Sequence, residues 1–125
     1  LQQQLDALET RHGLDTDFEG DGLEPDLPLK VKQVLFRVAQ EATHNVVKHA
    51  RAGRVVMTLE GDEESVLLRV EDDGVGFDPD REYLGHLGLR SMRERVEALA
   101  GEFAIESAAG AGTTVTVRVP RGERA

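Results

Sequence analysis

Three stretches of the chain place apolar residues three or four positions apart, which is the spacing of a helix with one buried face. The first begins at Leu1 and stops near Gly13, and the second and longest runs from about Leu29 to Ala50. The third closes at Gly101, and its apolar stripe consists of Leu89, Met92, Val96 and Leu99. We therefore expect three helices.

Short β-branched and apolar runs predict the strands. "RVVMTLE" and "ESVLLRVED" flank the turn residues Gly61 and Asp62 and are expected to form an antiparallel hairpin. "LDTDFEG" is a candidate first strand, and "EFAIES" and "TTVTVRVP" are candidates for the last two. Because the helices are interspersed with hairpins, the pattern predicts an α+β fold. We expect a two-layer α/β sandwich, with helices on one face of a mixed, mainly antiparallel sheet.

Length and charge narrow the class of protein. The chain has 125 residues, a net charge of −9 and no cysteine. We expect a single domain over residues 1–125, with no disulfide and no thiolate metal site. The negative charge argues against nucleic acid and anionic membranes as partners. No apolar run approaches the roughly 18 residues of a membrane span. We expect a cytoplasmic protein or the cytoplasmic part of a membrane-anchored one, with residues 1–12 continuing from an upstream domain.

Polar residues lie at the border of the long helix's core stripe. Asn45 falls just inside the stripe, and Glu41 and Lys48 lie beside it. One interpretation is an amphipathic boundary in which Lys48 pairs with Glu41. The other is a site where an amide oxygen ligates a metal, an ammonium meets phosphate and a carboxylate positions water. A buried amide without partners costs about 1–3 kcal/mol, which favours the second interpretation. The stripe consists of Val31, Leu35, Val38, Ala42 and Val46.

Glycine pairs follow the hairpin. In "DDGVGF", Asp72 ends a buried strand and needs a hydrogen-bond donor, such as the exocyclic amine of adenine. Gly74 and Gly76 let a ligand approach the main chain closely. "GHLGL" puts Gly85 and Gly88 ahead of a helix, where bare amides suit phosphate. "GAGTT" precedes the last strand. Each pair alone is also consistent with an ordinary turn or loop.

In this order and spacing, the motifs resemble the ATP-binding catalytic domain of two-component sensor histidine kinases. This family belongs to the GHKL superfamily, which it shares with gyrase and mismatch-repair ATPases. "EATHNVVKHA" resembles the N box, and "DDGVGF", "GHLGL" and "GAGT" resemble the three glycine boxes. The sequence from "GLRSM" to "VTVRVP" resembles the branch with a short nucleotide lid and a cytosolic kinase core. The resemblance runs from about Leu14 and implies the Bergerat-type fold.

The resemblance implies a site for ATP and Mg²⁺, and its adenine end comes from the strands. Asp72 would receive the adenine amine, Gly76 would let the backbone pass near the base, and Thr113 would hold the adenine through water. At the phosphate end, Asn45 matches the magnesium ligand and Lys48 the residue that contacts phosphate. His49 matches a phosphate- or ribose-contacting residue, and Gly85 and Gly88 match the lid glycines at the phosphates. The segment from Phe77 to Leu87 would be the mobile lid. Glu41 is a catalytic candidate whose role the resemblance leaves open.

The implied activity is donation of the ATP γ-phosphate to a histidine on a separate dimerisation domain, with a response regulator as an indirect partner. None of the four histidines, His12, His44, His49 and His86, has the sequence context of a phosphoacceptor. The chain alone is therefore expected to be monomeric and inactive as a kinase. Two alternatives remain: an anti-sigma-type serine kinase on the same fold, and a nucleotide-gated binding module without transfer chemistry.

Overall fold

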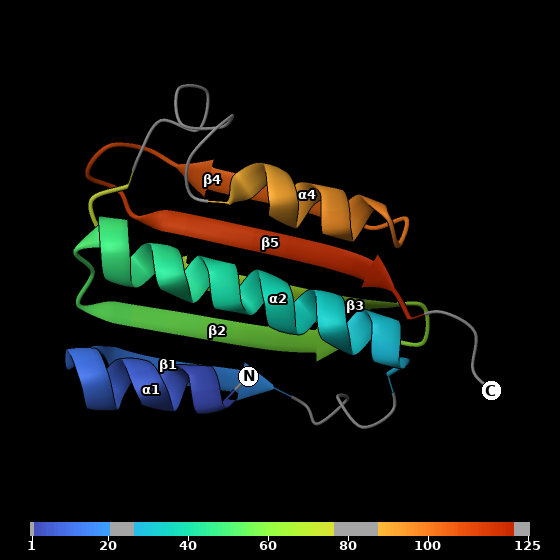
Figure 1. Ribbon diagram of the computed structural model, residues 1–125, viewed down its shortest axis with the longest axis horizontal. Coiled ribbons are helices and arrows are strands. Elements are labelled where there is room, and N and C mark those ends of the chain that lie inside the picture. The colour runs from blue at the N-terminus through green and yellow to red at the C-terminus, as the bar shows by residue number, and fades with distance from the viewer. Residues whose placement is uncertain (1, 21–26, 77–87, 122–125) are drawn as a thin grey trace.

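The computed structural model describes residues 2–20, 27–76 and 88–121 (Figure 1). The predicted lid, residues 77–87, lies outside the described residues, as do Gly85 and His86. Among the described residues, no helix has both the length and the apolar character that a membrane span requires. The elements are α1 (Gln2–His12), β1 (Asp15–Gly20), α2 (Leu29–Asn45), the π-helical turn η2 (Val46–Ala50), β2 (Arg54–Gly61), β3 (Ser65–Asp72), α4 (Leu89–Glu97), β4 (Glu102–Ser107) and β5 (Thr113–Pro120).

The described strands form one sheet in the order β1-β2-β3-β5-β4. β1 runs parallel to β2, and the other neighbouring pairs are antiparallel. The predicted hairpin is β2–β3, closed where the Asp62 amide donates to the Ser65 carbonyl over 3.0 Å. The expectation of an α+β fold with a mixed, mainly antiparallel sheet is thus confirmed. The sequence did not predict that β1 would lie at an edge, parallel to its neighbour.

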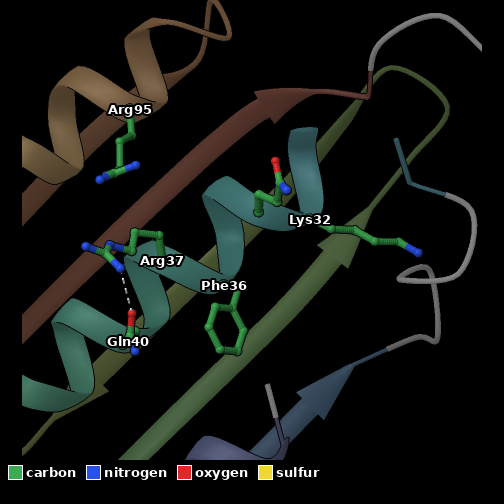
Figure 2. Close-up of a pocket in the computed structure, with 6 residues that line it drawn as sticks. Lys32, Phe36, Arg37, Gln40 and Arg95 are labelled. Carbon is green, nitrogen blue, oxygen red and sulfur yellow. Dashed lines mark hydrogen bonds between the residues drawn. The ribbon is translucent and has the colours of Figure 1, made fainter. Parts of the chain in front are cut away.

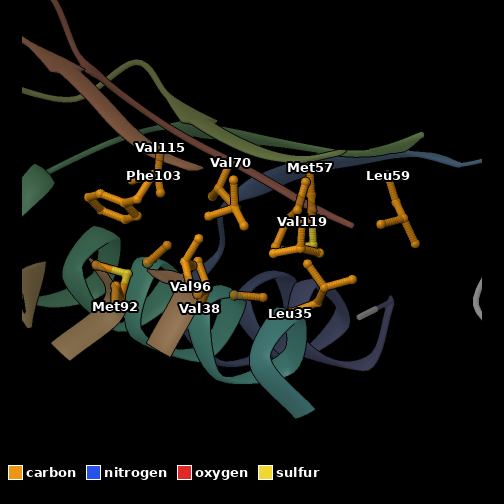
Figure 3. Packing of buried hydrophobic residues seen from close by; sticks show 14 of the residues in the cluster. Leu35, Val38, Met57, Leu59, Val70, Met92, Val96, Phe103, Val115 and Val119 are labelled. Atoms are coloured by element: carbon orange, nitrogen blue, oxygen red, sulfur yellow. The ribbon is translucent and has the colours of Figure 1, made fainter. Parts of the chain in front are cut away.

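One face of the sheet carries the core, and α2 and α4 cover it (Figures 1 and 3). Val38 of α2 and Val96 of α4 are fully buried beneath sheet residues such as Met57 and Val117. Removing each such side chain from water contributes about 1.5–3 kcal/mol. The predicted core stripe of α2 is confirmed, because all five of its residues are buried.

The last turn of the predicted long helix differs from expectation. The α-helix ends at Asn45, and residues 46–50 continue as the π-helical turn η2. Arg51 then ends the segment in the left-handed region, with φ of 51°. Short π-helical turns are frequent at functional sites. Here the turn begins directly after Asn45.

α1 packs beside β1 and α2 as part of the same body. Leu5 and Leu8 are buried, which confirms the helical spacing predicted for them. Gln4 also reaches α2, where its Nε2 donates to the Phe36 carbonyl over 3.3 Å.

The turn between β4 and β5 lies close to the end of β3. Gly112 has φ of 76°, and a Cβ added to it would lie 2.2 Å from the Asp72 carbonyl oxygen. Gly76 has φ of 68°, and its added Cβ would lie 2.0 Å from the carbonyl oxygen of Ala108. The turn between β4 and β5 is therefore fitted against the chain that leaves β3. Both contacts need a residue without a side chain.

We predict that Gly112→Ala destabilises the protein far more than Gly110→Ala. Both glycines have positive φ, but an added Cβ at Gly110 meets no described atom within 4 Å. The backbone penalty alone is about 1–2 kcal/mol, and it applies to both variants. The overlap with Asp72 should take Gly112→Ala to about 4 kcal/mol or more, as other severe packing defects do. Urea unfolding measures both, and equal losses would show that the close approach does not constrain the fold.

Candidate functional site

The predicted site residues come from elements that meet at one end of the sheet. Figure 1 shows the end of α2 with η2, the end of β3, the start of β5 and the start of α4 at this same end. In the sheet itself, register places Val55, Asp72, Thr113 and Ser107 side by side. The residues gathered at this end are Glu41, Asn45, Lys48, Asp72, Gly74, Gly76, Gly88 and Thr113.

Asp72 is a half-buried carboxylate at the end of β3. Its Oδ1 accepts a hydrogen bond of 2.8 Å from the Gly74 amide. Burial raises the pKa of Asp72, and the neighbouring charge of Asp73 raises it further, whereas the Gly74 and Thr113 amides act in the opposite direction. Removal from water is the largest of these effects on the pKa, so the ionised form of Asp72 lowers the stability of the free protein. A ligand that brings a hydrogen-bond donor would relieve that cost.

Asp73 has a different, structural task that the sequence did not indicate. It is exposed, and its Oδ1 accepts hydrogen bonds from the Arg54 and Gly53 amides over 2.9 and 2.8 Å. These bonds lower the pKa of Asp73. The carboxylate therefore ties the end of β3 to the start of β2. Of the two adjacent acids, Asp72 is the one whose charge is disfavoured by its surroundings.

Thr113 lies beside Asp72 and belongs to a small group of hydroxyls. Its Oγ1 is 2.8 Å from Ser107 Oγ, and Ser107 donates to the Gly112 carbonyl over 3.1 Å. Either hydroxyl can be the donor in this pair, and the Thr113 oxygen can also accept a hydrogen bond from water. Ser107 was not identified from sequence, because it lies in a different strand and carries no motif.

At the other end of the site, Asn45 is half-buried where α2 gives way to η2. This confirms its predicted position at the edge of the core stripe. Lys48 is exposed in η2, and the structure places the backbone of His49 in the same turn. Within the described residues, no ion pair joins Glu41 to Lys48. The alternative of a paired amphipathic boundary therefore loses its main support.

Glu41 instead reaches the start of α4. A Cβ added to Gly88 would lie 2.7 Å from Glu41 Oε2, and Gly88 has φ of 67°. Gly88 begins α4, and its carbonyl accepts the Met92 amide over 3.0 Å. Both residues were predicted as site residues from separate motifs, but their contact was not. It links the long helix to the chain that follows the predicted lid.

The described residues offer no group of three or more His, Asp or Glu side chains that could enclose a metal ion. A divalent cation bound here would take most of its ligands from a bound phosphate chain and from water. Mg²⁺ is commonly held in this way, with one or two protein oxygens. A lone amide oxygen such as that of Asn45 is compatible with that arrangement.

Comparison with known proteins agrees with this geometry. Residues 30–123 match the family described as histidine kinase-, DNA gyrase B- and HSP90-like ATPase. The chain is 33% identical over 120 residues to the signal transduction histidine-protein kinase/phosphatase DegS of Brevibacillus brevis, across 96% of this chain and 31% of that protein. It is 36% identical over 114 residues to the sensor histidine kinase MctS of Rhizobium johnstonii, across 89% and 24% of the two chains.

A solved structure is also similar. The blue-light activated histidine kinase of Erythrobacter litoralis EL346 superposes with a TM-score of 0.76 at 25% identity, over 96% of this chain and 40% of that one. The present chain thus spans less than a third of the length of the two relatives above. Since the family match covers well over half of the chain, the protein belongs to the family of histidine kinase-, DNA gyrase B- and HSP90-like ATPases.

Proposed function

We propose that this chain is the ATP-binding catalytic domain of a sensor histidine kinase. In this role it donates the ATP γ-phosphate to a histidine on a separate dimerisation domain, from which a response regulator receives it. The main support for the proposal is the environment of Asp72. This half-buried hydrogen-bond acceptor lies at the end of the sheet, where glycines allow neighbouring backbone segments to approach one another closely. ATP is a cytoplasmic substrate, so the proposal also locates this domain in the cytoplasm.

The adenine end of the proposed site is formed by the strands. Asp72 accepts the exocyclic amine, and the Gly74 amide holds the Asp72 carboxylate in place. Gly76 would hold the backbone near the base, as the family resemblance implies, while its missing side chain accommodates the Ala108 carbonyl. Thr113 supplies a hydroxyl oxygen for a water that bridges to the adenine, which its hydrogen bond with Ser107 supports.

The phosphate end is formed by α2, η2 and the start of α4. Asn45 is the proposed ligand of Mg²⁺, and the bound ion would neutralise charge on the phosphates. Lys48 and His49 contact phosphate or ribose, and Gly85 and Gly88 are lid glycines.

Glu41 is proposed as a catalytic residue because its carboxylate lies at Gly88, beside the phosphate end. From there it can orient a water molecule during slow hydrolysis of ATP.

A separate acceptor is part of the proposal because none of the four histidines has the sequence context of a phosphoacceptor. Transfer needs a nucleophile about 3–3.5 Å from the phosphorus and in line with the leaving oxygen. His12 and His44 are exposed on α1 and α2. The backbone of His49 lies in η2, directly after the α-helix that carries Asn45. His86 lies outside the described residues.

We predict that the domain binds ATP more tightly than GTP. Adenine presents an amine donor to Asp72, whereas guanine presents a carbonyl at the same position. The mismatch leaves buried groups unpaired, at about 1–3 kcal/mol, or roughly 5–150-fold in affinity. Titration calorimetry with Mg²⁺ present measures both nucleotides. Equal affinities would refute the assignment of Asp72 to the base.

We also predict that Asp72→Asn weakens ATP binding while stabilising the free protein at neutral pH. An amide keeps an oxygen for the Gly74 amide but presents a donor to the adenine amine. The folded-state pKa of Asp72 is raised, so the wild type loses stability relative to the variant as pH rises through that pKa. At pH values below 3.8, the ordinary pKa of an aspartate, the stabilities of the wild type and the variant should converge.

Urea unfolding of both proteins at several pH values tests this difference. Asp73→Asn is the matched control, because the pKa of Asp73 is lowered by the Arg54 and Gly53 amides. That substitution should instead destabilise the fold at neutral pH and leave the preference for ATP unchanged. A loss of stability in Asp72→Asn would show that the charge supports the fold.

The central test of the function is phosphotransfer in trans. With labelled ATP and Mg²⁺, the chain alone should gain no acid-labile phosphate, and a supplied dimerisation hairpin from a related kinase should become labelled on histidine. Asn45→Ala should abolish transfer with little change in melting temperature, because the residue is only half-buried.

The other outcomes distinguish the alternatives. Label on serine of a partner would favour the anti-sigma-type kinase. ATP binding without transfer to any supplied hairpin would favour the binding module. Acid-labile label on this chain alone would contradict the need for a separate acceptor.

A further inference from the structure

The outer face of α2 carries a second seam, opposite the core stripe, in which apolar and amide side chains alternate. Leu29, Gln33, Phe36 and Gln40 follow one another at helical spacing of three or four positions. The side chains of Leu29 and Phe36 are 69% and 50% exposed. Two large apolar residues two turns apart on a solvent face are the pattern by which one helix docks against another.

Cations flank this seam on both sides. Lys32 lies on one side and Arg37 on the other, and Arg95 joins them from α4. Together with the seam residues Gln33, Phe36 and Gln40, they line a hollow of about 540 Å³. Figure 2 shows Arg37 and Arg95 pointing into the same gap between the two helices.

The charges of these cations are not neutralised within the described structure. None of Lys32, Arg37 and Arg95 forms a salt bridge with a described carboxylate. Arg37 donates only to the neutral Oε1 of Gln40, over 3.3 Å. Two guanidinium groups facing one gap repel each other unless an anion is placed between them.

The same features do little for the stability of α2. Lys30 and Lys32 lie near its N-terminus, where the helix dipole disfavours positive charge. Leu29 and Phe36 expose apolar surface that folding normally removes from water. The chain as a whole has a net charge of −9, so this basic face also opposes the general charge. Local departures from stabilising patterns are typical of functional surfaces.

We propose that this face binds an acidic amphipathic helix of a partner protein. Apolar residues of that helix would pack against Leu29 and Phe36, and its flanking Asp or Glu side chains would meet Lys32, Arg37 and Arg95. Flanking charges of this kind choose the partner and set its orientation. A second copy using the same face would bring cation against cation, which disfavours a symmetric α2–α2 dimer.

This surface is separate from the proposed nucleotide site. The seam ends at Gln40, whereas the site begins with Glu41 and Asn45 at the other end of α2. Substitutions in the seam should therefore leave ATP binding intact, and retained ATP binding also reports that each variant is folded.

The experiment uses a labelled synthetic helix of about three heptads, with Leu at a and d and Glu at e and g. Fluorescence anisotropy at low salt should detect binding to the wild-type chain. Phe36→Ala should weaken it by about tenfold, as loss of an aromatic anchor does. Arg37→Glu with Arg95→Glu should abolish it and favour a matched helix with Lys at e and g. Arg118→Glu is the control, since this exposed residue lies on the opposite face of the sheet.

Several results would overturn the proposal. If polyglutamate or an oligonucleotide competes as well as the Glu helix, the α2 face is only a nonspecific cluster of cations. Equal binding of the Glu and Lys helices, or no effect of Phe36→Ala, would remove the specific docking mode. Self-association in sedimentation that Phe36→Ala abolishes would make a second copy the occupant.

Discussion

The packing of α2 across the sheet is the constraint on which the site depends. Val38 and Val96 are fully buried against the strands, so neither α2 nor α4 can slide without opening the core. With the helix fixed there, its last turn falls at the end of the sheet where β3 ends and β5 begins (Figure 1). Apolar packing, together with the pairing of the strands, thus brings an amide at the end of the stripe and a carboxylate at the end of a strand to one place.

At the end of β3, two adjacent acids, Asp72 and Asp73, have surroundings that shift their pKa values in opposite directions. Asp73 receives two backbone amides and stays in water, which favours its charge. Asp72 loses water to the protein, and its charge is disfavoured. One carboxylate therefore stabilises the junction of β2 and β3, and the other remains available for a ligand. In the proposed function, Asp73 serves stability, whereas Asp72 serves binding at a cost in stability.

Much of this arrangement follows from local sequence. The core stripe of α2, the β2–β3 hairpin and the border position of Asn45 depend on periodicity and turn residues, which act over a few positions. The parallel edge strand β1 and the bonds from Asp73 to Gly53 and Arg54 depend on contacts between distant segments. The π-helical turn η2 also had no sequence signal, because α- and π-helical turns accept the same residue types. The local sequence of β1 does not specify its parallel pairing with β2, and the local sequence around Asp73 does not specify its bonds to Gly53 and Arg54.

The contact between Glu41 and Gly88 has a consequence for divergence among related proteins. The two positions are far apart in sequence but occupy one volume, since any Cβ at 88 would meet the Glu41 carboxylate. Because that carboxylate is the far end of a flexible side chain, a lineage that acquires a side chain at 88 must turn residue 41 aside, and it must also tolerate a left-handed backbone at 88. A change at 88 should therefore give the side chain of residue 41 a new direction. The long helix and the start of α4 are linked through space in this way.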